Sequence, residues 1–233
     1  MNLNNKQSTL FLNKFSNEYF EDTKNVRNFF ADYLLSIFSK KDLIKFDVAE
    51  WGIGGGHNLH LLSHYVNKVH AYDGSNEGIK SFKHSYEVKS NSEMFYAKLV
   101  NLAEPFETPI KYDLIIYGFF PYVLNDDELQ QTKLNLLKAL KPNGYVVVFD
   151  FLARDNKINT YRGDDIVKTY KRNLKYWLNY FDDFDLIDYR LFDSNKNMEY
   201  KFQDTFKIDT NIPMDDNFWT FISCFRKIDE NNS

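Results

Sequence analysis

The sequence predicts a single α/β domain built on a doubly wound, mostly parallel sheet of seven strands. Short apolar strand patterns alternate with amphipathic helical patterns through most of the chain, which is typical of successive strand–helix–strand units. A cluster of glycines follows the first strand pattern. The chain has 233 residues and shows no internal repeat or low-complexity linker, so we interpret 1–233 as one domain.

The first 40 residues are predicted to form an N-terminal helical extension. Residues 1–17 are expected to be a weakly ordered lead. Between Asn17 and Lys40, apolar residues recur at spacings of three and four, which predicts an amphipathic helix. These residues are Phe29, Phe30, Tyr33, Leu34, Ile37 and Phe38.

The middle of the chain, 46–151, is predicted to be the cofactor-binding half of the domain. Its strand patterns are Lys45–Glu50, Val69–Tyr72, Met94–Leu99, Tyr112–Tyr117 and Tyr145–Phe151. Its helical patterns are His57–Val66, Glu77–Val88 and Asp126–Leu140, the last with an acidic first turn that suits the helix dipole. Strands separated by helices in this way are expected to be parallel.

The last part of the domain, 152–227, is predicted to supply an acceptor-side helix and the closing strands. The helix is expected over Asp164–Phe181, and the strands over Leu186–Phe192 and Phe218–Phe225. A helix followed by two consecutive strands can close such a sheet with an antiparallel C-terminal edge strand.

Composition narrows the classes of partner. The net charge is −4, which argues against a nucleic-acid partner because phosphate contacts need a basic face. Cys224 is the only cysteine, so no intrachain disulfide can form. The N-terminus has no signal-peptide pattern and the chain has no run of 18 apolar residues, so we expect a cytoplasmic protein with no membrane partner. The oligomeric state stays open.

The stretch 47–56 is the most informative in the chain, because a strand pattern there leads into glycines and then into a helical pattern. Glycines at such a turn allow positive φ and let the backbone approach a ligand closely. Asp73, at the end of the next strand pattern, is placed to accept hydrogen bonds from ribose hydroxyls. Taken alone, this arrangement fits either a dinucleotide or an adenosyl cofactor.

The spacing of the glycines argues against the dinucleotide. In the pattern G-x-G-x-x-G, the third glycine position counted from Gly52 is His57, and counted from Gly54 it is Leu59. The pattern present instead is acidic-x-G-x-G-x-G, and it is carried by Glu50, Gly52, Gly54 and Gly56. It resembles the first motif of the class I S-adenosylmethionine-dependent methyltransferases, which implies a Rossmann-like fold.

The resemblance continues in order along the chain. Lys111–Ile116 is similar to the fourth-strand motif of that family, and Leu140–Gly144 is similar to its helix stop before the fifth strand. The resemblance is continuous from about Phe46 to Phe151 and is weaker to Lys227. Asp73 after the second strand pattern and Asn101–Leu102 after the third also match in order. Each motif alone is weak, and these four in register are a strong signal.

The resemblance implies a role for each residue of the cofactor site. The glycines would let the loop pass under the methionine part of S-adenosylmethionine, and Glu50 would favour its ammonium group. Asp73 would accept hydrogen bonds from both ribose hydroxyls. The residues that would flank the adenine or lie along the cofactor are Asn101, Leu102 and Tyr117. Tyr19 would cap the cofactor or pack in the core.

No catalytic dyad or triad is evident, and methyl transfer from a sulfonium needs mainly orientation and exclusion of water. The stretch 119–122 follows the fourth strand pattern and is expected to face the reacting methyl group. Tyr122 would line the acceptor pocket or pack in the core. Asp150 would orient or deprotonate an acceptor, or cap the loop that follows it. Arg162 would bind an anionic acceptor or form a surface ion pair.

Three histidines raise the question of a metal. His57, His60 and His64 share one face of the helical pattern after the glycines. No cysteine or carboxylate lies nearby in sequence to complete a coordination shell, so we expect no metal site.

We expect an S-adenosylmethionine-dependent methyltransferase that transfers a methyl group to oxygen or nitrogen of a small polar metabolite, with S-adenosylhomocysteine as product. Two alternatives stay open. One is a nicotinamide-dependent oxidoreductase, and the other is a non-catalytic methyltransferase-like binding protein on the same fold.

Overall fold

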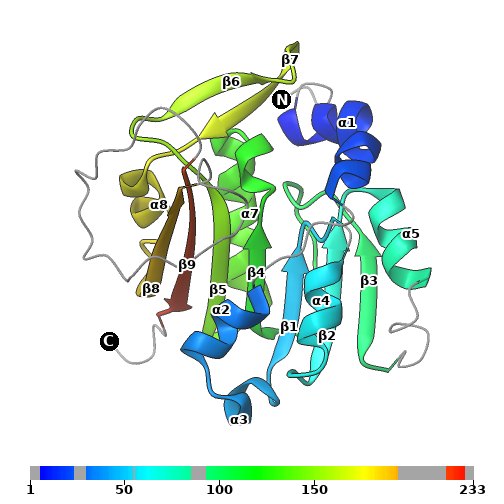
Figure 1. The fold of residues 1–233 in the computed structure, drawn as a ribbon, viewed down its shortest axis with the longest axis vertical. Coiled ribbons are helices and arrows are strands. Elements are labelled where there is room, and N and C mark those ends of the chain that lie inside the picture. Colours follow the sequence, from blue (N-terminus) through cyan, green and yellow to red (C-terminus); the bar gives the residue numbers. More distant parts are fainter. Residues whose placement is uncertain (1–5, 24–29, 55, 85–92, 194–218, 229–233) are drawn as a thin grey trace.

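The computed structural model describes residues 6–23, 30–54, 56–84, 93–193 and 219–228 (Figure 1). Its main sheet has seven strands in the order β3-β2-β1-β4-β5-β9-β8. The bounds are β1 Asp47–Trp51, β2 Lys68–Asp73, β3 Phe95–Leu99, β4 Tyr112–Gly118, β5 Leu140–Leu152, β8 Phe184–Asp193 and β9 Trp219–Lys227. Neighbouring strands from β3 to β5 are parallel, and β9 is antiparallel to both β5 and β8. The predicted mostly parallel sheet with an antiparallel C-terminal strand is confirmed. That strand is β9, and it lies between β5 and β8, so β8 forms the edge of the sheet.

Helices cover both faces of the sheet. One core joins side chains of α2 (Phe30–Ile37), α4 (His57–Leu62) and α5 (Asn76–His84) to the sheet. The other core joins α7 (Asp126–Ala139) and α8 (Leu174–Tyr180) to the opposite face. In Figure 1, α2 and α4 lie in front of the sheet and α7 lies behind it. This is the doubly wound arrangement that the alternating pattern predicts.

The strand order reverses between β1 and β4. The chain runs from β1 outward through β2 to β3, and then returns to place β4 on the other side of β1. At such a switch point, the loops that follow the two central strands leave in opposite directions and open a crevice at the carboxyl ends. The fold therefore places the glycine cluster after β1 at the position where ligands of open α/β sheets bind.

The expectation of a weakly ordered lead over 1–17 is wrong for 7–17, and 1–5 lie outside the described residues. Residues Gln7–Thr23 form helix α1, which contacts strand β7 (Asp164–Lys171) at the end of the molecule that also carries strand β6 (Lys157–Tyr161) (Figure 1). The helix predicted over 17–40 is also corrected, because its first residues end α1 and a separate helix, α2, follows. Ser39 then caps the short helix α3 (Lys40–Leu43).

The helix predicted over Asp164–Phe181 is wrong in its first half. Strands β6 (Lys157–Tyr161) and β7 (Asp164–Lys171) form an antiparallel hairpin there, and only α8 is helical. Arg162 and Gly163 join the two strands with φ values of +50° and +79°, the backbone of a tight hairpin turn. Burial of Val167 and Thr169 on one face of β7 follows the period of two that marks a strand.

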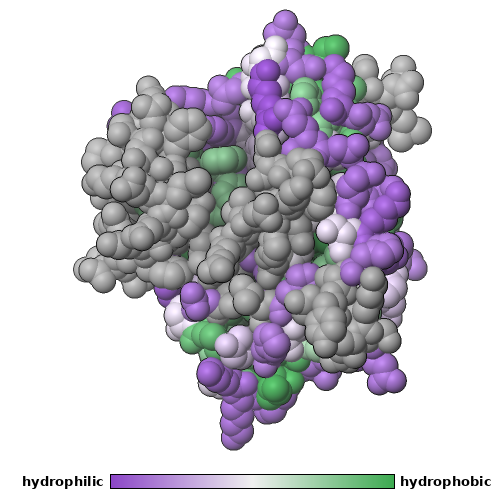
Figure 2. Space-filling view, turned by 45° about the vertical axis from the view of Figure 1, so that its right-hand side comes forward, coloured by the Kyte–Doolittle hydropathy of each residue, from purple (hydrophilic) through white to green (hydrophobic). Residues whose placement is uncertain are grey.

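The outer surface is polar in character on the face drawn in Figure 2. Hydrophilic side chains make up most of the coloured surface there, and apolar ones gather in small groups. In the ranges that the structure describes, no helix combines the length and the apolar composition needed to span a bilayer.

Candidate functional site

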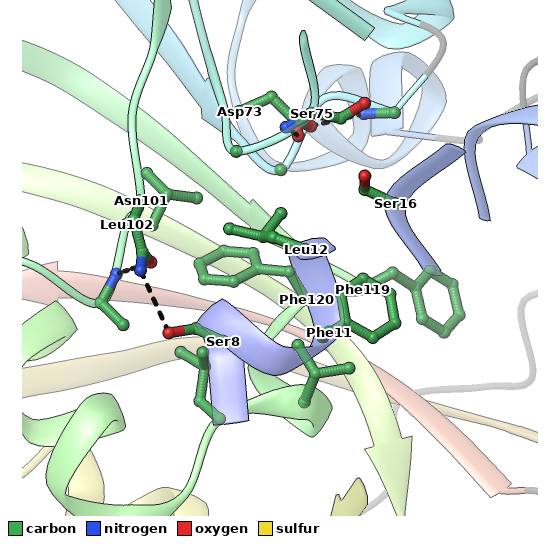
Figure 3. Close-up of a pocket in the computed structure, with 16 residues that line it drawn as sticks. Ser8, Phe11, Leu12, Ser16, Asp73, Ser75, Asn101, Leu102, Phe119 and Phe120 are labelled. Atoms are coloured by element: carbon green, nitrogen blue, oxygen red, sulfur yellow. Dashed lines mark hydrogen bonds between the residues drawn. The ribbon is translucent and has the colours of Figure 1, made fainter. Parts of the chain in front are cut away.

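A pocket opens at the carboxyl ends of β1 to β4, beneath helix α1 (Figure 3). The empty space between its walls, open solvent included, is about 670 Å³. The lining residues are Ser8, Phe11, Leu12, Ser16, Gly52, Gly54, Asp73, Gly74, Ser75, Asn101, Leu102, Ala103, Phe119, Phe120, Val123 and Leu124. Five of these are among the predicted cofactor-binding residues: Gly52, Gly54, Asp73, Asn101 and Leu102.

The glycine loop forms the floor of the pocket, and its conformation requires glycine. Gly52 and Gly54 have φ values of +79° and +52°, in the left-handed region that side chains disfavour. A Cβ atom on Gly52 would lie 2.8 Å from Cδ1 of Phe120, which is closer than real Cβ contacts allow. The backbone of this loop is therefore bare on the side that faces the pocket.

Asp73 ends β2 and is buried at the edge of the pocket. Its Oδ2 accepts a hydrogen bond from the Gly54 N–H at 3.1 Å, and its Oδ1 accepts one from the Ser75 N–H at 2.7 Å. Burial raises the pKa of this carboxyl to about 6, against the opposing effect of the backbone N–H groups. A carboxylate only accepts hydrogen bonds, which suits this group to ligand hydroxyls at the edge of the pocket.

Glu50 lies at the end of β1, buried beside the glycine loop, and does not itself line the pocket. Its Oε1 accepts a hydrogen bond from Nδ2 of Asn58 at 2.7 Å. Its Oε2 is buried and has no hydrogen-bond partner among the described residues. Burial is the main reason that the pKa of Glu50 rises to about 8, and the Asn58 hydrogen bond opposes that rise. An orphaned buried carboxylate oxygen is costly, so this group fits a site that a ligand cation completes.

Asn101 and Leu102 follow β3 and line the pocket. Oδ1 of Asn101 accepts a hydrogen bond from the Ala103 N–H at 3.1 Å, which fixes a tight turn. Nδ2 of Asn101 donates to Oγ of Ser8 at 3.2 Å. The carbonyl of Leu102 accepts from Asn135 Nδ2 at 3.0 Å, which ties this wall to helix α7.

The wall after β4 is aromatic. Phe119 and Phe120 both line the pocket, as expected for residues that follow the fourth strand. Phe119 has φ of +48°, an unusual backbone conformation for a bulky side chain, and its ring packs 4.2 Å from that of Phe149. The ring of Phe120 packs 4.6 Å from that of Tyr117.

Helix α1 supplies the roof, which sequence reasoning missed. Its contributions are Ser8, Phe11, Leu12 and Ser16, which face Asp73 and Asn101 across the pocket in Figure 3. The Leu12 methyl groups lie so near Gly74 that a Cβ there would be 2.6 Å away. The spacing of residues 8, 11, 12 and 15 is helical, so a signal for this helix was present in the segment interpreted as a weakly ordered lead.

Two predicted tyrosines lie away from the pocket. Tyr117 is fully buried in the core, with its ring 6.2 Å from that of Trp51, and it does not line the pocket. Tyr122 is also outside the lining, and its ring meets that of Phe151 edge-on at 5.2 Å. The structure thus favours the packing role that the sequence left open for Tyr122.

The two charged candidates for the acceptor site, Asp150 and Arg162, also lie outside the pocket lining. Asp150 is buried on β5, where its Oδ1 accepts a hydrogen bond from the Phe151 N–H at 2.7 Å and burial raises its pKa to about 8. Arg162 lies in the turn of the β6–β7 hairpin and forms an ion pair with Glu18 of α1. It therefore ties the roof helix to the hairpin.

Gly56 and His60 lie at the start of helix α4 and within it. Gly56 precedes α4 with φ of +75°, and a Cβ there would meet Phe82 at 2.6 Å, so it serves packing between helices. The ring of His60 stacks on that of Phe82. Over the described part of the chain, no group of three or more His, Cys, Asp or Glu side chains is arranged to hold a metal ion. The side chains of His57 and Tyr19 lie outside the described residues.

Comparison by sequence finds no matching family model and no matching curated protein. Comparison by structure finds solved methyltransferases. The DhpI–SAH complex matches with a TM-score of 0.57 and 15% identity over 94% of this chain and 96% of that one. The 1,6-didemethyltoxoflavin-N1-methyltransferase of Burkholderia thailandensis matches with a TM-score of 0.65 and 10% identity, over 95% and 89%. The N-methyltransferase NodS of Bradyrhizobium japonicum matches with a TM-score of 0.58 and 11% identity, over 96% and 100%. The chain has the S-adenosylmethionine-dependent methyltransferase fold.

The methyltransferase fold accounts for the position of the pocket. In this chain it brings the ends of β1, β2, β3 and β4 to one crevice, with the glycine loop in the middle. Two buried carboxyl groups lie next to that loop, Glu50 near the end of β1 and Asp73 at the end of its parallel neighbour β2. Glu50 and Asp73 lie close enough in space for the charge of Asp73 to act on Glu50, although they are 23 positions apart in the sequence.

Proposed function

We propose that this protein is an S-adenosylmethionine-dependent methyltransferase that transfers a methyl group to an oxygen or nitrogen atom of a small polar molecule. The observation that carries the proposal is the pair of buried carboxylates at the ends of β1 and β2. Glu50 has an oxygen without a partner among the described residues, and Asp73 lines a pocket whose floor is bare glycine backbone.

The residues present fit the parts of this cofactor. Oε2 of Glu50 would hold the ammonium group, directly or through water. The Asp73 carboxylate would accept hydrogen bonds from the ribose hydroxyls. Asn101 and Leu102 would flank the adenine. The aromatic wall of Phe119 and Phe120 would then face the reacting end, because it follows β4, on the other side of β1 from β2 and β3.

The bound cofactor would supply an activated methyl group on sulfur. The chain's own part is to orient the reactants and keep water out. The apolar side chains Phe11, Phe119 and Phe120 and the roof helix are suited to the second task. The described pocket lining contains no histidine, lysine or arginine, so the proposal assigns no general base.

A small acceptor is supported by the shape of the site. Helix α1 roofs the pocket, so the described opening suits a small molecule better than a polymer. The negative net charge argues in the same direction against nucleic acid. The solved neighbour that acts on 1,6-didemethyltoxoflavin shows that the same fold serves a small-molecule acceptor in another protein.

Two measurements test the proposal. Titration calorimetry should show one molecule of S-adenosylhomocysteine bound per chain, and no heat with NAD, which separates this function from the nicotinamide-dependent alternative. Methyl-labelled S-adenosylmethionine incubated with the protein and a metabolite extract should label a small compound. Binding without any labelled product would favour the non-catalytic alternative, and binding of NAD alone would overturn the proposal.

A further inference from the structure

A chain of hydrogen bonds links helix α7, the roof helix α1 and the wall after β3. Oε1 of Glu128 accepts from the Ser8 hydroxyl at 2.6 Å and from the Ser8 N–H at 2.8 Å. The same Ser8 oxygen accepts from Nδ2 of Asn101 at 3.2 Å, the bond that Figure 3 shows as a dashed line. We call Glu128, Ser8 and Asn101 the Ser8 network.

Glu128 is held rigidly by the start of its own helix. Asn125 caps α7 and accepts from the Glu128 N–H at 3.0 Å, while Oε2 of Glu128 accepts from the Asn125 N–H at 3.0 Å. This reciprocal capping box fixes one carboxylate oxygen and aims the other at α1. Glu128 is buried and does not line the pocket, so it does not meet a ligand there.

The number of available protons sets the direction of every bond in the network. A carboxylate only accepts, so the single proton of the Ser8 hydroxyl is committed to Glu128. The Ser8 oxygen can then receive only a donor, and the Asn101 side chain must turn its NH₂ group toward it. The Asn101 oxygen is thereby turned toward the Ala103 N–H. The charge on Glu128 thus orients an amide in the pocket wall.

We propose that Glu128 is a positioning residue for the cofactor site. Acting through Ser8, it orients the Asn101 amide and holds the roof helix over the pocket. The proposal rests on the proposed function, because the group that Asn101 would meet is the adenine of the cofactor. It also gives a reason for an amide rather than an acid at position 101. An aspartate there would set a second acceptor against a Ser8 hydroxyl that has only one proton to donate.

Matched variants separate positioning from simple stability. Ser8→Ala and Glu128→Ala each break the Ser8 network, and Asn125→Ala removes the other half of the same capping box while leaving Glu128 bonded to Ser8. Two quantities are measured for each: hydrogen exchange of the α1 amides without ligand, and the Kd for S-adenosylhomocysteine by calorimetry. A lost hydrogen bond to a charged group predicts α1 exchange and Kd each raised about tenfold in the two network variants. The control variant Asn125→Ala should lower the Tm but leave α1 exchange and the Kd within about twofold of the parent values.

Two combinations make the test sharper. Because Ser8→Ala and Glu128→Ala break the same network, the double variant should be no weaker in binding than the worse single variant. Asn101→Asp should weaken binding, and adding Glu128→Gln to it should restore part of the affinity, since the Gln amide can donate to Ser8.

The outcomes decide the proposal separately from the proposed function. Additive effects of the two network variants, or network variants that behave like Asn125→Ala, overturn the role of Glu128. Faster α1 exchange with an unchanged Kd also overturns it, because the network would then be merely structural. If the parent protein binds no S-adenosylhomocysteine, the proposed function fails and the positioning role in a cofactor site is overturned with it. The α1 exchange then shows whether the network still holds the roof helix.

Discussion

The backbone N–H of Gly54 donates to Oδ2 of Asp73 at 3.1 Å, so the glycine loop after β1 is fastened to the acid that ends β2. This bond orients Asp73 before any ligand arrives, and it leaves the carboxylate at the edge of the pocket. Because the acceptor is already ordered, little binding free energy is lost in ordering it when a ligand binds. The pair therefore links the loop conformation to ribose recognition in the proposed function.

Asp73→Ala should weaken binding of S-adenosylhomocysteine by about 1–3 kcal/mol, because the ribose hydroxyls lose a charged, buried acceptor. Calorimetric titration measures the change. The matched control is Asp165→Ala, which removes an exposed acid from β7 and should leave the Kd unchanged. An unaltered affinity in the Asp73 variant would place the ligand elsewhere.

Gly52→Ala tests the bare floor of the pocket. Gly52 and Gly163 share a φ of +79°, but a Cβ on Gly52 meets Phe120 at 2.8 Å while a Cβ on Gly163 meets nothing within 4 Å. Gly163→Ala should therefore cost only the backbone strain, about 1 kcal/mol of unfolding free energy, and leave ligand binding intact. Gly52→Ala should cost more and also abolish binding. Equal behaviour of the two variants in denaturation and calorimetry would refute the argument from the Phe120 contact.

The pH dependence of stability reports on Glu50. Its pKa in the folded protein is raised to about 8, above the unfolded value of about 4.5, mainly by burial. The stabilisation from its protonated form is therefore fully present below pH 4.5 and is lost as the pH rises toward 8. Glu50→Gln cannot ionise, so its free energy of unfolding should fall less than that of the parent between pH 5 and 8.5. Urea denaturation at both pH values measures this, and parallel losses in the two proteins would contradict the assignment.

Arg172 supports the pocket wall from beneath. The guanidinium is buried and donates to the carbonyls of Leu124 at 2.7 Å and Pro121 at 3.2 Å, as well as to Asp126. Arg172→Met leaves both carbonyls without this donor, so we expect a loss of about 2–4 kcal/mol in thermal or urea unfolding. Asp126→Asn should cost less than about 1 kcal/mol, because its side chain is 72% exposed. A larger loss in the Asp126 variant would show that the ion pair, and not the carbonyls, is what matters.

The sequence predicted the floor of the pocket because its signals are local. A strand that leads into Gly52 and Gly54 requires positive φ, and Asp73 follows the next strand at a fixed structural position. Both places are dictated by backbone geometry and by parallel strands ending at one edge. The seven-stranded sheet was predictable for the same reason, since each strand and helix carries its own period.

The roof and the hairpin depend on contacts between distant segments. The pocket-facing side of α1 carries Ser8 and Ser16 among its apolar residues, so the periodic signal is weak, and Ser8 gains its place from Glu128, 120 positions away. In the hairpin, the polar residues between Asp164 and Lys171 fit a helix as well as a strand. Only pairing with β6 through the Arg162–Gly163 turn decides between them. Tyr117 is buried in the core, and its strand pattern alone does not predict whether its side chain faces the core or the pocket.

The central claim is that the pocket over the glycine loop holds an adenosyl cofactor, and a crystal structure of the protein grown with S-adenosylhomocysteine tests it most directly. The account predicts density for the ligand over Gly54, with the ribose on Asp73 and the amino group at Glu50. A crystal in which the ligand lies elsewhere, or in which this crevice stays closed by Phe120 and Leu12 at saturating ligand, would contradict it.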